Sequence, residues 1–211
     1  MKRIVIAAWI VLLGILLTAG ALSAGQNGNG AFSGQQALST VEAENLAFMR
    51  EEEKLARDVY LYLFDVWGQW LFDNIAAAEQ QHMDAVGNLL DNYNLADPSA
   101  GNGAGEFTNQ DLQKLYDSLT QQGSASELDA LYVGATIEDM DINDLERILS
   151  ETDKPDFIMV CENLMKGSRN HLRAFVGQIE LLGGTYQAQY LTPDEVDDIL
   201  DAPRETGFYQ P

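Results

Sequence analysis

Apolar side chains recur at intervals of three and four residues over four long segments, and this spacing constrains the fold more than any other feature of the chain. Residues 41–67, 73–93, 126–151 and 155–182 each show it, as a helix with one buried face requires. No stretch of any length shows the strict alternation of a half-buried strand. We therefore expect an all-α fold in which four amphipathic helices bury their apolar faces against one another.

The connections between these segments indicate how the helices are joined. Gly68 allows a break after the first helix, and Asp73 or Asn74 can cap the second. Residues 95–107 carry Asp-Pro and several glycines, which is typical of a long connection, and a short helix follows over residues 108–123. The four-residue string Thr192-Pro-Asp-Glu195 predicts one more small helix through a capping box. This order is typical of a four-helix bundle with one long crossover between its second and third helices.

The N-terminus has the pattern of a signal peptide. Lys2 and Arg3 precede an apolar run over residues 4–22 that ends in small residues. The run is also close to the lower length limit of a spanning helix, so an uncleaved N-terminal anchor stays open. We expect residues 1–24 to direct export, 25–40 to form a flexible linker, 41–200 to form the bundle, and 201–211 to form a tail. The domain would then work outside the cytoplasm, either secreted or anchored and facing outward.

Charge and cysteine content exclude several kinds of partner and stabilisation. The formal net charge is −21 at pH 7, so nucleic acid and anionic lipid surfaces are unfavourable partners. Cys161 is the only cysteine of the sequence, which rules out an intramolecular disulfide and leaves stability to packing. We expect this thiol to act as a small buried hydrophobe.

The chain has only two histidines, and each falls among apolar neighbours of a predicted helix. Glu79 and His82 are three residues apart, so on one helix their side chains point toward the same spot. A neutral imidazole is a ready ligand for a transition metal. Taken alone, this Glu-x-x-His pair also fits a plain Glu–His hydrogen bond.

The first helix adds a run of three glutamates. On a helical wheel Glu51 points outward, whereas Glu52 and Glu53 both fall inside the apolar arc, and the wheel does not decide between them. Arg50 and Arg57 offer another interpretation, an intrahelical ion pair with Glu53 that contributes only a few tenths of a kcal/mol.

The third and fourth long helices carry a similar set. Glu138 lies in the apolar stripe of residues 126–151, with Asp141 one turn further on, and a carboxylate there is costly unless a cation or metal compensates it. His171 lies in the stripe of the last long helix, but the residue three before it is Ser168 instead of a carboxylate. Taken alone, His171 also fits a core imidazole held by a hydrogen bond.

Together, the inward stripes read Glu, then Glu-x-x-His, then Glu, then Ser-x-x-His. Bundles that bind a pair of iron or manganese ions use one glutamate from each of two helices and a Glu-x-x-His from each of the other two. Carboxylate and imidazole ligands suit iron or manganese, and the lack of a thiolate cluster argues against structural zinc and iron–sulfur sites. The candidate ligands are Glu53, Glu79, His82, Glu138 and His171, with Glu52 and Asp141 as additional candidates.

At these residues the chain resembles the ferritin-like di-iron superfamily. The string Glu53-Lys-Leu-Ala-Arg-Asp-Val-Tyr60 is similar to the first helix of ferritins and rubrerythrins, where the ligand glutamate is followed by alanine at +3 and tyrosine at +7. This resemblance favours Glu53 over Glu52. The fuller strings over residues 49–57, 78–86 and 167–175 look like a ferritin-like family of prokaryotic domains with no assigned function. The resemblance covers roughly residues 41–200 and breaks at Ser168, which leaves five ligands where the general pattern has six.

The resemblance implies an exported di-iron or di-manganese protein that oxidises Fe(II) or reduces O2 or peroxide. Tyr60 would donate a hydrogen bond or an electron, or would serve only in core packing. The sequence has no Cys-x-x-Cys pair for a built-in electron donor, so turnover would need an external reductant. The alternatives are a metal-binding or envelope interaction module without turnover, and a bundle with buried Glu–His pairs and no metal. A homo-oligomer stays open.

Overall fold

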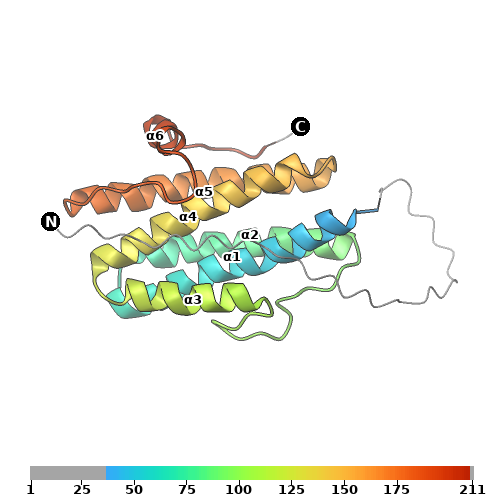
Figure 1. The fold of residues 1–211 in the computed structure, drawn as a ribbon, viewed down its shortest axis with the longest axis horizontal. Coiled ribbons are helices and arrows are strands. Elements are labelled where there is room, and N and C mark those ends of the chain that lie inside the picture. Colours follow the sequence, from blue (N-terminus) through green and yellow to red (C-terminus); the bar gives the residue numbers. More distant parts are fainter. Residues whose placement is uncertain (1–36, 210–211) are drawn as a thin grey trace, which may run out of the picture. The chain divides into compact units, whose positions relative to one another are not determined.

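The computed structural model describes residues 37–209, which form six α-helices and no β-strand (Figure 1). The all-α prediction is confirmed for this part of the chain, whereas the predicted signal peptide and nearly all of the predicted linker lie outside it. Between residues 37 and 209 no helix combines the length and the hydrophobicity needed to span a membrane. The helices are α1 Thr40–Trp67, α2 Trp70–Asn92, α3 Gln110–Gly123, α4 Glu127–Ser150, α5 Pro155–Leu181 and α6 Pro193–Asp201.

Local signals explain most helix ends, and two of them differ from the sequence prediction. Helix α1 begins at Thr40 because Ser39 and Glu42 form a capping box, a signal present in the sequence that we did not use. Helix α2 begins at Trp70, so the predicted cap at Asp73 or Asn74 is wrong. Gly68 ends α1 in the left-handed conformation at φ 65°, and α2 starts two residues later without a side-chain cap. The predicted capping box at Thr192 is confirmed.

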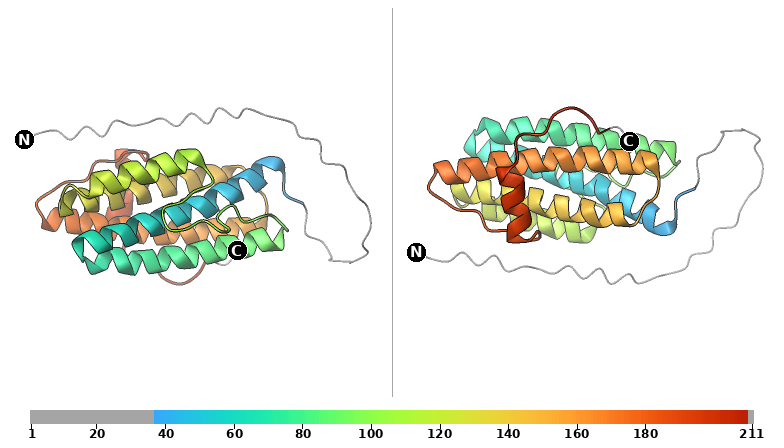
Figure 2. Two further views of the ribbon diagram at one scale, coloured as in Figure 1. Left: turned by 90° about the horizontal axis from the view of Figure 1, so that it is seen from below. Right: turned by 90° about the horizontal axis from the view of Figure 1, so that it is seen from above.

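The four long helices pack as two pairs, α1 with α2 and α4 with α5 (Figures 1 and 2). Helix α2 contacts α5 and α1 contacts α4, so the two pairs face each other across a shared interior. Helix α3 covers α1 and α4 from one side, and α6 packs across α5 from the other (Figure 2). Side chains of α1 and α2 that point into this interior therefore meet side chains of α4 and α5.

The crossover between α2 and α3 runs along α1 and is fastened to it by buried charges. Lys54 Nζ donates to Asp58 Oδ2 at 2.5 Å and to the Gly103 carbonyl at 2.7 Å, and Asp58 Oδ2 also accepts from the Gly105 amide at 2.9 Å. Glu51 is buried, although the helical wheel placed it outward, because the backbone amide of Thr108 donates to its carboxylate at 2.6 Å. The crossover thus covers the part of α1 around Glu51, Lys54 and Asp58, all of which are buried.

Aromatic rings fill the interior next to these helices. The ring of Phe175 lies 5.3 Å from that of Tyr60 and 5.6 Å from that of Phe72, and all three side chains are fully buried. Helix α4 can approach this cluster because residue 134 is glycine: a Cβ atom built there would stand 2.4 Å from Phe175 Cε1. Close packing of α4 on α5 therefore depends on Gly134.

We expect Gly134→Ala to lower the free energy of unfolding by about 1–3 kcal/mol, because the added methyl group overpacks the core. Gly177→Ala in α5 is the matched control: its Cβ would meet nothing within 4 Å. Alanine is the better helix former, so this control should raise the free energy of unfolding by about 0.5–1 kcal/mol. Denaturant unfolding of both variants measures the contrast, and equal stability of the two would contradict the packing argument.

Candidate metal centre

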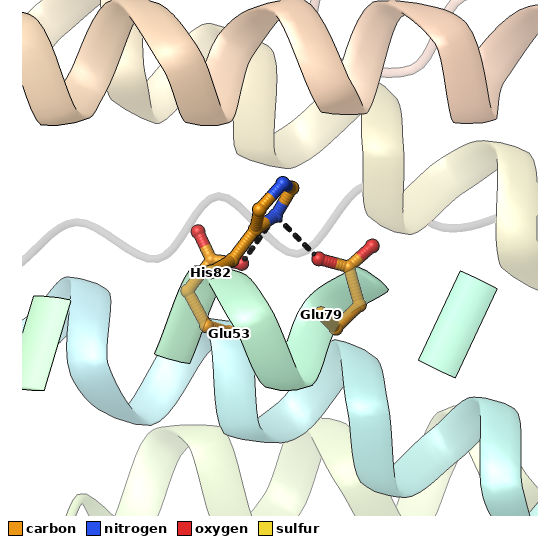
Figure 3. Close-up of side chains that lie close together, drawn as sticks. All are labelled: Glu53, Glu79 and His82. Atoms are coloured by element: carbon orange, nitrogen blue, oxygen red, sulfur yellow. Dashed lines mark hydrogen bonds and ion pairs between the residues drawn. The ribbon is translucent and has the colours of Figure 1, made fainter. Parts of the chain in front are cut away.

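Helices α1 and α2 bring three candidate ligands together on the side that faces α4 and α5 (Figure 3). Glu79 and His82 lie one turn apart on α2, and Glu53 reaches them from α1 (Figure 3). His82 Nδ1 is 2.7 Å from Glu79 Oε2 and 3.2 Å from Glu53 Oε2. One imidazole nitrogen and two carboxylate oxygens therefore converge on a single point.

A second group of the same composition lies beside the first. His171 on α5 places its Nδ1 atom 2.9 Å from Glu79 Oε1 and 3.4 Å from Glu138 Oε2, which comes from α4. The His82 and His171 rings are stacked with centroids 5.7 Å apart. Glu79 belongs to both groups, one oxygen facing each histidine, so its carboxylate stands between two neighbouring sites.

The spacing within each group fits a shared metal ion. In each group one ligand atom from every residue lies within 4.8 Å of the others. With metal–ligand distances of about 2.1 Å and near-right angles, two ligands of one ion stand about 3 Å apart. The atoms Glu79 Oε1 and His171 Nδ1 are buried 2.9 Å apart, yet neither is hydrogen-bonded in the described part of the chain. A carboxylate oxygen and an imidazole nitrogen at this distance share either a proton or a metal ion.

Nothing basic except the two imidazoles neutralises these carboxylates among residues 37–209. Arg50 donates to Asp97 and Arg57 to Asp58, so the ion pair proposed between Glu53 and these arginines does not form. The remaining oxygen of Glu138 accepts a hydrogen bond from Tyr60 at 2.5 Å. Tyr60 therefore donates a hydrogen bond to Glu138 on another helix, while its ring packs in the core beside Phe72 and Phe175.

The pKa values follow from burial and from this crowding of charge. Burial raises the pKa of Glu53 to about 7, although His82 opposes the rise. Burial lowers the pKa of His171, but the carboxylates of Glu79 and Glu138 outweigh it and raise the value to about 10. Burial likewise acts to lower the pKa of His82, and Glu79 and Glu53 raise it well above its usual value. Without a metal both imidazoles are therefore protonated, and their positive charge compensates the buried carboxylates.

The two additional candidates, Glu52 and Asp141, are buried next to the centre but belong to neither group. Burial raises the pKa of Glu52 well above its usual value, and among neighbouring charges that of Asp144 adds most to the rise. Asp141 reaches α5, where the hydroxyl of Ser168 donates a hydrogen bond to its Oδ2 atom. The structure therefore links Asp141 to the residue three before His171 on α5.

A glycine that the sequence reasoning did not single out positions His82. A Cβ atom at residue 167 would stand 2.6 Å from both Cε1 and Nε2 of the His82 ring, and 3.9 Å from Cε1 of His171. The imidazole of α2 thus lies directly against the backbone of α5. Only its place in the string before Ser168 could have drawn attention to Gly167, since the contact depends on how the two helices meet.

The fold and the two groups define the class: an all-helical protein with adjoining buried carboxylate–imidazole clusters of metal-ligand spacing. The family model described as an uncharacterised protein domain, DUF2202, matches residues 42–203, and the chain belongs to this family.

A relative and a solved structure extend this result. The chain is 50% identical over 174 residues to the uncharacterised protein MJ0754 of Methanocaldococcus jannaschii, a match that covers 82% of this chain and 94% of the relative. The crystal structure of the hypothetical protein MJ0754 matches with a TM-score of 0.80 and 49% identity, over 83% of this chain and 100% of that one. The helical arrangement is therefore shared with an experimentally determined fold.

We expect Gly167→Ala to displace the His82 imidazole while leaving His171 nearly in place, because the new methyl group would clash with the first ring only. With two histidines in the chain, nitrogen-15 NMR resolves one set of imidazole signals for each. The His82 signals should shift strongly, and Gly177→Ala on the same helix should shift neither set. Unchanged His82 signals in Gly167→Ala would show that the ring does not depend on this contact.

Proposed function

We propose that the protein is a ferritin-like carboxylate protein that binds two iron or manganese ions between its helix pairs. Helices α1, α2, α4 and α5 would form the four-helix bundle, with the crossover between α2 and α3. The observation that carries the proposal is the pair of buried groups that share Glu79. The first ion would be held by Glu53, Glu79 and His82, and the second by Glu79, Glu138 and His171.

The donor set favours these metals by its chemistry. Each group offers carboxylate oxygens and one imidazole nitrogen, a mixture that suits Fe(II) or Mn(II), whereas structural zinc and iron–sulfur sites use thiolates. Cys161 is buried and free, with its Sγ atom 4.0 Å from Met49 Sδ. Its place in the packed core argues for the role of a small hydrophobe and not for a place among the ligands.

We propose that the centre oxidises Fe(II) or reduces O2 or peroxide. A bound pair of redox-active ions supplies electrons and open coordination positions. The chain itself would fix the ligands and limit the access of water: Tyr60 holds Glu138, while the side chains of His82 and His171 stay 14% and 12% exposed at the α2–α5 seam. That seam would admit a molecule as small as O2 or peroxide. The exported location rests on residues 1–24 alone.

A second candidate function is metal binding without turnover, and Ser168 is the observation that favours it. Where α5 of the general pattern would add a carboxylate, this chain has a hydroxyl that is already bonded to Asp141. A centre with one ligand fewer would hold its second ion more weakly. Such a protein would store or pass on the metal.

Anaerobic titration of the full chain with Fe(II) tests the metal centre. We expect two ions per chain, with Glu79→Gln weakening both sites and His82→Ala weakening one. The loss should be at least about tenfold in affinity, since even outer-shell substitutions cost 10–100-fold. Glu51→Gln is the matched control: this buried glutamate of α1 contacts the crossover and not the histidines, and it should leave both sites intact. Wild-type affinity in Glu79→Gln would contradict the assignment.

Exposure of the loaded protein to O2 or peroxide separates the two functions. Rapid oxidation of both ions, followed by near-ultraviolet absorbance, is expected of the redox enzyme. Two bound ions that stay reduced would support the module without turnover.

A further inference from the structure

We propose that Asp141 supplies the fourth carboxylate of this metal centre, in place of the carboxylate that α5 lacks at Ser168. The inference rests on the proposed function and names one more ligand of the same centre. Its basis is the contact between a buried acid of α4 and the serine that stands three residues before His171.

The geometry brings the acid to the right helix. Asp141 lies one turn beyond Glu138 on α4 and is buried. Ser168 is 1% exposed, and its hydroxyl donates to Asp141 Oδ2, with the Leu164 carbonyl as a second acceptor at 3.0 Å. A glutamate at position 168 would complete the second Glu-x-x-His. Here the carboxylate at that position arrives from the neighbouring helix and is fixed by the hydroxyl of the residue it replaces.

The surroundings of Asp141 are those of a ligand without its ion. Among residues 37–209, Ser168 is the one hydrogen-bond donor to the Asp141 carboxylate, and no lysine or arginine pairs with it. Burial raises the pKa of Asp141 well above its usual value, and the charges that add to this effect are Glu53, Glu138 and Glu79. These three glutamates are the carboxylate ligands of the two groups. A buried acid that faces only other acids requires a proton or a cation.

Charge balance points to the same residue. Two divalent ions bring four positive charges, and neutral imidazoles offset none of them. Glu53, Glu79 and Glu138 supply three negative charges, which would leave one positive charge uncompensated in a buried site. With an ionised Asp141 the loaded centre is neutral, the state that costs least in a medium of low dielectric constant.

Glu52 is the other buried acid close enough to be considered, and its Oε1 atom is buried without a hydrogen-bond partner among the described residues. The charges around it differ from those around Asp141. The charge that acts on it most strongly is that of Asp144, and Asp144 is itself paired with Arg147 at 3.4 Å. The acid that acts most strongly on Glu52 is thus one already paired with an arginine, ahead of Asp141 and Glu53, whereas all three acids that act on Asp141 belong to the ligand groups. Glu52 also precedes a ligand on α1, so Glu52→Gln is a matched control for removing one buried acid.

The experiment measures Co(II) and Fe(II) binding to the full chain by anaerobic titration, and the Co(II) absorption spectrum reports the ligand set. We compare wild type, Asp141→Asn, Glu52→Gln and the double variant Asp141→Asn/Ser168→Glu. Asp141→Asn should lower the affinity of one ion by at least about tenfold and change the Co(II) spectrum, while Glu52→Gln leaves two ions bound. The double variant should regain the second ion, because a glutamate at position 168 returns the carboxylate to α5.

The amide of Asp141→Asn can still accept from Ser168, so the metal-free fold should survive, and circular dichroism checks this. Ser168→Ala is a second variant that removes only the hydroxyl, and it should weaken the same ion by about 10-fold as an outer-shell change. Wild-type binding by Asp141→Asn, or a loss that Ser168→Glu does not restore, would overturn the assignment of Asp141. If wild type binds no metal, or if Glu79→Gln changes nothing, the proposed centre itself is refuted.

Discussion

Carboxylates packed against one another without a basic side chain are the physical constraint on which this structure depends. Glu53, Glu79 and Glu138 lie at most 2% exposed between the helix pairs, and within the described chain the only basic groups that contact them are two imidazoles. Burying an ionised carboxylate costs several kcal/mol unless positive charge or hydrogen bonds compensate it. In the metal-free state the raised pKa values of the two histidines show where that charge comes from. A metal ion entering the centre must displace those protons, which couples its binding to pH.

Burial alone does not separate a ligand carboxylate from a structural one, because the chain buries both kinds. Asp139 is fully buried and accepts from the Tyr186 hydroxyl and from backbone amides of residues 189–191. Asp58 and Glu51 are likewise saturated by Lys54, Arg57 and the amides of the crossover. These acids fasten distant segments to α1 and α4. The acids of the candidate centre differ because few hydrogen-bond donors contact them. The sequence does not reveal this difference, since the donors come from distant parts of the chain.

Sequence periodicity was enough to predict the helical class, the order of the helices and the inward position of Glu53, Glu79, His82, Glu138 and His171. All these inferences depend on which face of a helix a residue occupies, a quantity set by spacing alone. Burial of Glu51 could not be predicted in this way, because a crossover far along the chain covers it. The contacts of Asp141 with Ser168 and of Gly167 with His82 depend on the register and distance between two helices. A helical wheel describes one helix and therefore gives neither the register nor the distance between two.

The same inter-helix geometry makes the centre asymmetric, because the four long helices do not contribute equally to it. Its carboxylates come from α1, α2 and α4, while α5 contributes one imidazole and, at Gly167, bare backbone. Gly167 leaves no side chain where the His82 ring meets α5, and both histidines keep some exposure. In the proposed centre each ion would have three protein ligands, and Asp141 of α4 would give the ion beside α5 a fourth without adding a side chain to α5.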